Sequence, residues 1–200
     1  MANLMYQASS QVLTHHLKNL SAILKLAAKD AKARGIDPAV LLNARLAPDM
    51  LPLVRQVQIA TDHAKGCCAR LAGLESPAYP DDEASFAELE ARIKKALVFM
   101  RGVKAAEYEG CDERQITLKL PFGELSFKGA DYLHGWALPN FYFHYSTAYA
   151  ILRHNGIAVG KREFLGVVPG MQMNAKAAKA MGVKSTPKPK PKPKKASKQS

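Results

Sequence analysis

The chain contains no long apolar stretch and no amino-terminal targeting pattern. Its 200 residues include no apolar run approaching the roughly 18 residues that a membrane-spanning helix needs. The opening segment, MANLMYQASSQ, lacks a basic region followed by an apolar block, so a secretory signal is not expected. These absences favour a cytoplasmic protein without a membrane partner.

Cysteine is scarce as well. The chain has three cysteines, the adjacent Cys67 and Cys68 and the separate Cys111, and it has no CxxC motif. An odd number with an adjacent pair disfavours a disulfide framework and favours free thiols in a reducing cytoplasm. Cys67 and Cys68 also lack the basic setting at a helix N-terminus that activates a thiolate. We therefore expect buried, unreactive thiols rather than a nucleophile.

Recognisable catalytic motifs are absent. The sequence has no Ser-His-Asp order, no glycine-rich phosphate loop, no HExxH and no Walker pattern. Motifs alone therefore indicate no reaction class. Any function has to be inferred from polar residues on the predicted helices.

Acidic residues are missing from the end of the chain, which holds much of the positive charge. Residues 175–200 contain nine lysines and no acid, so without them the formal net charge falls from +12 to +3. The Lys-Pro repeats of STPKPKPKPKKASKQS lack interior hydrogen-bond donors and repel one another. We predict a folded domain at residues 1–170 and a basic, disordered tail at 171–200, within which MNAKAAKAMG could form one or two helical turns. Nonspecific contact of the tail with nucleic acid is conceivable, but the tail has no aromatic side chains to stack on bases and a solubilising role is favoured.

The spacing of apolar residues predicts four helices and one hairpin. Apolar side chains recur every three to four residues in the helical segments, which is typical of helices with one buried face. The segments QITLKL and LSFK alternate strictly around the turn sequence PFGE, as expected of a short β-hairpin. The helices are expected at residues 2–34, 48–71, 86–102 and 130–155, and the hairpin at 115–128. We therefore predict an all-α fold, an up-down four-helix bundle whose hairpin precedes the last helix and covers one end of the bundle.

Local signals refine these boundaries. Gly35 is expected to end the first helix, and Asp37-Pro38 to cap a short helical turn. Ser85-x-x-Glu88 fits a capping box at the third helix. Pro139 lies four residues after Gly135, a pairing that predicts a tolerated kink in the last helix.

Other side chains of the helices are expected to have ordinary surface or packing roles. The outer face of the third helix is expected to be solvated and comprises Glu88, Glu90, Arg92, Lys94 and Lys95. On the last helix, three tyrosines lie mostly beside the inward stripe and are expected to pack with solvated hydroxyls: Tyr142, Tyr145 and Tyr149.

Polar residues also occur on inward faces of two predicted helices. Asn140 and His144 lie four residues apart on the core-facing stripe of the last helix, so their directions differ by only about 40°. A stripe on the margin of the apolar face of the second helix is formed by Gln56, His63, Cys67 and Arg70. Such a margin is either the lip of a pocket or a solvated edge. We predict a ligand pocket formed by Gln56, His63, Asn140 and His144.

The same residues suggest a metal site. His63 and His144 are candidate ligands of a divalent metal such as zinc, with Asn140 or His16 as third ligand and Asp49 or Asp62 as weaker candidates. His134 and His154 each point about 80° away from His144 and do not join this cluster. The alternative is that the inward histidines are hydrogen-bonded core residues. Both interpretations stay open at the level of sequence.

The order of elements resembles a known superfamily. The stretches that carry the likeness are MYQASSQVLTHHLKNLSAIL, RGIDPAVLLNARLAPDMLPLVRQVQIATDHAKG and LPNFYFHYSTAYAILRHNGIAVGKREFLG. They resemble the DinB/YfiT-like metalloenzyme fold, and within it a bacterial family of unknown function.

The resemblance implies a four-helix bundle, a plausible homodimer and a three-histidine metal site, with one histidine on the second helix and an HxxxH pair on the last. His144 matches the second histidine of that pair and Asn140 stands at the first, while His63 lies about one turn after the usual second-helix ligand. The favoured hypothesis is a non-catalytic ligand-binding or structural role. The alternative that the resemblance implies is a metal-dependent (zinc or nickel) hydrolase or thiol transferase that uses His63 and His144.

Overall fold

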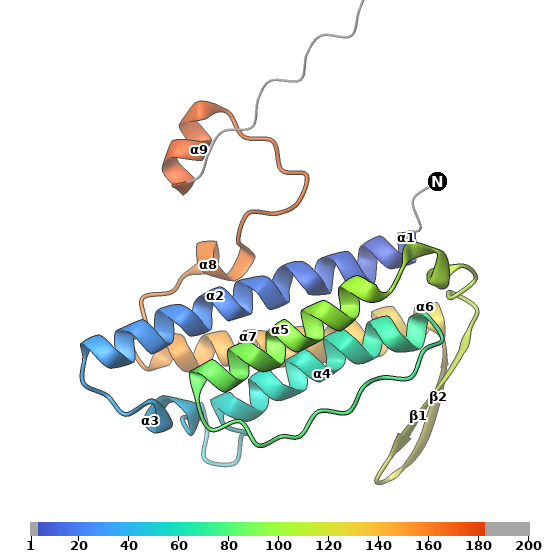
Figure 1. The fold of residues 1–200 in the computed structure, drawn as a ribbon, viewed down its shortest axis with the longest axis horizontal. Coiled ribbons are helices and arrows are strands. Elements are labelled where there is room, and N and C mark those ends of the chain that lie inside the picture. The colour runs from blue at the N-terminus through green and yellow to red at the C-terminus, as the bar shows by residue number, and fades with distance from the viewer. Residues whose placement is uncertain (1–3, 183–200) are drawn as a thin grey trace, which may run out of the picture. The chain divides into compact units, whose positions relative to one another are not determined.

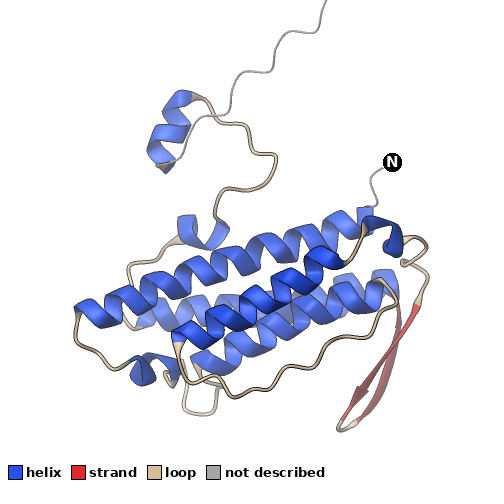
Figure 2. Ribbon diagram, viewed as in Figure 1, coloured by secondary structure: helices blue, strands red, loops and turns tan. Residues whose placement is uncertain are grey.

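The computed structural model describes residues 4–182, which fall into two compact units. The first unit ends at Gly166 and contains the helical bundle, and the second begins at Val167. Within the first unit, long helices lie side by side and a two-stranded hairpin extends from one end (Figures 1 and 2). The predicted all-α bundle with a hairpin before its last helix is confirmed.

The first long helix runs without interruption through three segments. They are α1 (Leu4–Tyr6), the π-helical η1 (Gln7–Gln11) and α2 (Val12–Ala33). Gly35 has φ +64°, so it takes the left-handed conformation that commonly follows a helix end. The short α3 (Pro38–Leu42) follows, and the carboxylate of Asp37 accepts a hydrogen bond from the Ala39 N–H, as its predicted capping role requires.

The second long helix, α4 (Leu53–Leu71), begins five residues after Pro48, the start that the sequence suggested. That start is wrong because residues 43–52 form a loop, whose end is fixed by a hydrogen bond from the Leu53 N–H to the Ala44 carbonyl (3.0 Å). A second proline, Pro52, takes an extended conformation directly before α4. The third long helix, α5 (Phe86–Gly102), begins as predicted, with the Ser85 hydroxyl accepting from the Glu88 N–H.

A short 3-10 helix, η2 (Ala105–Tyr108), leads to the hairpin of β1 (Gln115–Leu120) and β2 (Gly123–Lys128). The strands pair antiparallel, with Ile116 opposite Phe127 and Leu118 opposite Leu125. Ile116 and Leu118 are buried, so the predicted apolar face does pack against the bundle.

The last long helix also has three segments, α6 (Gly129–Asp131), the π-helical η3 (Tyr132–Ala137) and α7 (Leu138–His154). Pro139 lies in the first turn of α7, directly after the π-helical stretch. This wider turn accommodates the missing backbone donor of proline, so the helix continues past it, as predicted.

The core lies between the four long helices. α4 packs against both α7 and α5, and α2 packs against α5. The apolar stripe of α4 is fully buried and consists of Leu53, Val57, Ala60, Ala64, Cys67 and Leu71. Another short helix, α8 (Lys161–Leu165), packs on α2. The adjacent α4 and α7 carry the residues of the predicted pocket.

The second unit contains α9 (Ala175–Met181), capped by the Asn174 side chain. The sequence allowed one or two helical turns in this segment, and α9 forms them. The boundary between the units falls at Gly166 rather than at residue 170. The Lys-Pro repeats predicted to be disordered lie outside the described residues. Between residues 4 and 182, no helix combines the length and apolar character that crossing a bilayer requires.

Candidate functional site

A hydrogen bond between α4 and α7 forms the centre of the candidate site. Gln56 is buried, and its Nε2 donates to the Leu51 carbonyl at 3.0 Å. Its Oε1 therefore faces the Nδ1 atom of His144, at 2.7 Å. Because an amide oxygen only accepts, the proton of the neutral imidazole sits on Nδ1, and Nε2 keeps a free lone pair.

His63 lies beside His144 across the same helix pair. The two rings are stacked, with centroids 5.9 Å apart and planes 14° apart. Burial, followed by the charges of His144 and Arg70, lowers the pKa of His63 to about 4. Burial also lowers the pKa of His144. Both rings are therefore neutral at pH 7, since a second positive charge in this space would be costly.

A cavity of about 260 Å³ opens beside His63. Its walls come from α4, η3 and β1, so the hairpin closes one side of it. They include Ile59, His63, Arg70, Leu118, Lys119 and Trp136. Of the polar residues on the margin of α4, His63 and Arg70 line this cavity, whereas Gln56, Asn140 and His144 are not among its lining residues.

His63 presents its ring nitrogens to accessible space. Among residues 4–182, no group hydrogen-bonds to the His63 ring, and neither ring nitrogen is among the side-chain atoms that are both buried and unpartnered. Its unbound nitrogens are therefore open to solvent or to a ligand. A neutral imidazole offers one donor and one acceptor there.

The other two candidates from the sequence have different partners. Asn140 donates to the Trp136 carbonyl at 2.8 Å, within its own helix. His16 bonds through Nδ1 to the Val12 carbonyl at 2.9 Å, and its ring packs edge-on against Tyr142 and Tyr145. Gln56, His63 and His144 thus form one cluster, whereas Asn140 and His16 are engaged by backbone carbonyls.

The donor set does not meet the needs of a three-ligand metal centre. Catalytic zinc sites have three protein ligands and an open position. Throughout the described part of the chain, no three His, Cys, Asp or Glu side chains lie close enough to hold one metal ion. His63 and His144 alone offer two imidazoles, so no step of a reaction is assigned to a metal.

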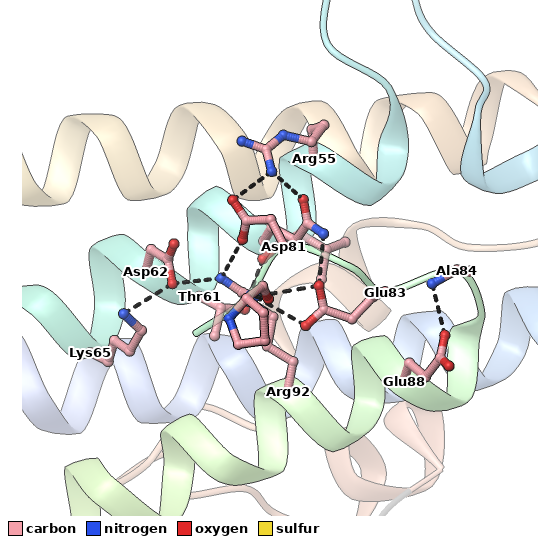
Figure 3. A network of polar contacts seen from close by, with 12 residues as sticks. Arg55, Thr61, Asp62, Lys65, Asp81, Glu83, Ala84, Glu88 and Arg92 are labelled. Atoms are coloured by element: carbon pink, nitrogen blue, oxygen red, sulfur yellow. Dashed lines mark hydrogen bonds and ion pairs between the residues drawn. The ribbon is translucent and has the colours of Figure 1, made fainter. Parts of the chain in front are cut away.

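The prediction for the outer face of the third helix is wrong at Arg92, whose side chain is only 1% exposed. Its guanidinium contacts Asp62 at 2.7 Å, Asp81 at 3.0 Å and Glu83 at 3.0 Å, and it donates to the Pro80 carbonyl at 2.8 Å (Figure 3). The loop between α4 and α5 folds over Arg92, and this burial could not be read from helical periodicity. The network joins α4, α5 and their connecting loop.

Further ionic and aromatic contacts hold the same loop. Lys65 is buried and bonds to Asp62 at 3.1 Å and to the Pro77 carbonyl at 2.7 Å. Arg55 bonds to Asp81 at 2.6 Å. The ring of Tyr79 packs beneath the ammonium groups of Lys65 and Lys95, at 4.7 and 4.3 Å from its centroid. These groups are engaged with one another, so this network has a structural role.

The predicted roles of the tyrosines and thiols are confirmed in part. Tyr145 is fully buried and its hydroxyl donates to the Phe164 carbonyl at 2.6 Å, so the expected solvated hydroxyl is wrong there. The three cysteines are free and buried, as predicted. Burial raises the pKa of Cys68 to about 11 and that of Cys67 well above its ordinary value. His134 and His154 are exposed, which confirms that they do not join the cluster.

The sequence did not single out three residues of the cavity. Arg70 was part of the polar margin but received no role, and Lys119 and Trp136 had no predicted connection with His63. The spacing of Gln56, His63 and Arg70 along one margin was the available signal for Arg70. No local pattern encodes the side on which the hairpin folds or the helix against which η3 packs, so neither Lys119 nor Trp136 could have been placed.

Comparison with known proteins agrees with this arrangement. Residues 5–165 match a family described as Domain of unknown function (DUF1993). The chain belongs to this family. A crystal structure of a DinB family member protein from Shewanella denitrificans is 40% identical in sequence, with a TM-score of 0.79 over 85% of this chain and 96% of that one. No curated protein matches the chain. The DinB-like fold that the sequence resembled is therefore established.

Proposed function

We propose that this DUF1993 domain binds a small molecule, without catalysis, in the cavity beside His63. The observation that supports this is the set of unbound imidazole nitrogens at a cavity of about 260 Å³. A ligand site combines mostly apolar walls with a few oriented polar groups, and the neutral His63 offers such a group. His144, which is hydrogen-bonded to Gln56, stacks on the His63 ring. Asn140, which the sequence assigned to the pocket, donates a hydrogen bond to the backbone carbonyl of Trp136, a residue that lines the cavity.

A metal-dependent hydrolase or thiol transferase is the second candidate. One observation favours it: Gln56 holds the Nδ1–H of His144, which leaves the Nε2 lone pair available, as second-shell partners of metal-bound histidines do. The missing third ligand counts against it. The favoured proposal requires no group beyond those already present.

Fragment binding followed at the histidines tests the main proposal. NMR spectra of the untagged protein labelled at histidine should show ligand-induced shifts at His63 when a library of neutral and charged fragments is screened. Replacing His63 with alanine should weaken the binding of the same fragments, whereas the matched replacement of the exposed His134 should leave their binding unchanged. A library that shifts no signal near the cavity at millimolar concentration would refute the proposal.

Metal analysis separates the two candidates. Protein purified without a His tag is expected to carry less than one equivalent of zinc or nickel, and a chelator should leave its Tm unchanged. Stoichiometric metal that disappears in both His63→Ala and His144→Ala would instead support the metalloenzyme. The homodimer and the cytoplasmic location that we expect stay predictions, and gel filtration tests the first.

A further inference from the structure

Arg70 is held in a fixed position at the cavity. A side chain at Gly66, one turn earlier on α4, would collide with the Arg70 guanidinium, so the glycine allows that group to lie along the helix. The Arg70 NH1 group donates to the hydroxyl of Tyr132 at 3.0 Å, and Tyr132 is fully buried in η3. Two elements therefore orient the guanidinium, and little conformational freedom remains to be lost when it binds another group.

The guanidinium has donors left for a ligand. A guanidinium carries five N–H groups, and Tyr132 takes only one of them. None of the ion pairs between residues 4 and 182 involves Arg70. Its Nε and NH2 atoms are also absent from the buried unpartnered atoms of this part of the chain, so they face accessible space. Because Arg70 lines the cavity, these donors are available to a molecule within it.

The charges around the cavity leave Arg70 as its unpaired cation. Asp62 also lines the cavity, but it is bound by Arg92 at 2.7 Å and Lys65 at 3.1 Å. The side chain of Lys119 is 85% exposed, and its ammonium lies 4.0 Å from Glu124 next to the turn of the hairpin. The cavity therefore favours a ligand with a single negative charge.

Apart from Thr117, whose hydroxyl bonds to the Ser126 hydroxyl at 3.1 Å, the remaining walls are apolar and indicate an apolar body for that ligand. Ile59, Leu118, Leu120 and the indole of Trp136 surround the space. A cavity of about 150 Å³ is large enough for benzene. About 260 Å³ therefore accommodates one ring and a charged group. A planar carboxylate matches the fork of a guanidinium in a bidentate pair.

We propose that this cavity binds a small organic carboxylate, with Arg70 binding the carboxylate and Trp136 packing on its apolar body. This inference rests on the proposed function and names the ligand class of the same site. Gly66 and Tyr132 act as positioning residues that hold the guanidinium. A dianion such as phosphate fits less well, because the single unpaired guanidinium does not balance its second charge.

Benzoate and benzamide form a matched pair of probes, because they share shape but differ in charge at pH 7. Trp136 is the only tryptophan in the chain, so its fluorescence reports on this cavity directly. Benzoate should change the Trp136 emission in a saturable manner and bind at least tenfold more tightly than benzamide. Because Arg70→Met removes the charge-assisted pair, it should weaken the binding of benzoate about 10- to 100-fold and leave the affinity for benzamide within about twofold of its original value.

Two controls accompany this titration. Arg101→Met removes the same charge from the exposed end of α5 and should not change benzoate binding. Arg70→Lys keeps the charge without the planar fork and should bind benzoate with intermediate affinity. The comparison of the two probes on the unchanged protein needs no variant and stands even if Arg70→Met fails to fold.

The outcomes separate the inference from the function on which it rests. Equal affinity for benzoate and benzamide, or benzoate binding that is unaffected in a folded Arg70→Met, overturns the carboxylate inference and leaves a neutral ligand site standing. Inorganic phosphate that binds as tightly as benzoate and depends on Arg70 overturns the carboxylate class. If neither the probes nor the fragment library changes the Trp136 emission or the His63 signals, the proposed function falls as well.

Discussion

Replacing Arg92 with methionine should destabilise the bundle by about 3 kcal/mol. Methionine retains the aliphatic stem but removes a charge whose side chain is 1% exposed. Breaking a buried ion pair typically costs about 3–5 kcal/mol, because the partner charge is left buried and unpaired. The lower end applies here, since the side chains of Asp62 and Asp81 are each 38% exposed and keep Lys65 and Arg55 as partners. The largest part of the cost comes from Glu83, whose side chain is only 9% exposed and would keep the hydrogen bond from Gln58 without a charged partner from Arg92.

Urea unfolding of Arg92→Met, alone and combined with Glu83→Gln, measures this loss of stability. A loss of about 3 kcal/mol corresponds to a fall in Tm of roughly 6–12 °C for a domain of this size. Lys94→Met on the same helix is the matched control, because Lys94 is exposed, and it should stay within about 0.5 kcal/mol of the unchanged protein. Adding Glu83→Gln to Arg92→Met should recover part of the loss by removing the stranded charge.

The pH dependence of this variant gives a further check. Burial raises the pKa of Asp81, but the hydrogen bond and charge of Arg55, with the charge of Arg92, outweigh it and hold that pKa below its ordinary value. The stability from this carboxylate is therefore present above about pH 4 and is lost as the pH falls further. The penalty of Arg92→Met should shrink over the same range. A loss below 1 kcal/mol at pH 7, or one equal to that of Lys94→Met, would refute the account of a buried charge network.

Three further predictions concern the site and the core. Gln56→Leu should cost about 1–3 kcal/mol of unfolding free energy in urea, because it leaves the Nδ1–H of His144 without an acceptor; a loss below 0.5 kcal/mol would contradict that hydrogen bond. The pKa of His63 is lowered to about 4 in the folded protein, whereas in the unfolded chain it is near 6.5. The free energy of unfolding should therefore fall by on the order of 3 kcal/mol as the pH falls from 6.5 to 4, because the unfolded chain binds the proton first. A folded His63→Leu variant should show a smaller dependence of stability on pH over this range. The three buried thiols should not react with Ellman's reagent in the native protein and should all react in denaturant, whereas fast native labelling of any one would show that its site is open.

Several parts of the site could be inferred from sequence because they depend on helical register. Asn140 and His144 share a face at any tertiary arrangement, and the same register correctly separated His134 and His154 from the cluster. Gln56 and His63 lie on one margin of α4 for the same reason, and α4 does pack against α7. The partner of each side chain was beyond this reasoning. Register could not reveal that Asn140 turns back to the Trp136 carbonyl or that His144 binds Gln56.

The sequence by itself determined the elements of this protein: four long helices, their caps and a hairpin ahead of the last helix. Periodicity, glycine and proline placement and capping residues act within a few positions, so they are legible without a structure. Only the tertiary structure decided which polar groups are buried and paired. The loop from α4 to α5 turned Arg92 from a surface residue into the centre of a charge network. The packing of η3 on α4 placed Trp136 beside His63 and Arg70, and the position of β1 placed Lys119 there. Burial and pairing depend on residues far apart in the chain, so local sequence patterns do not predict which polar groups become buried and paired.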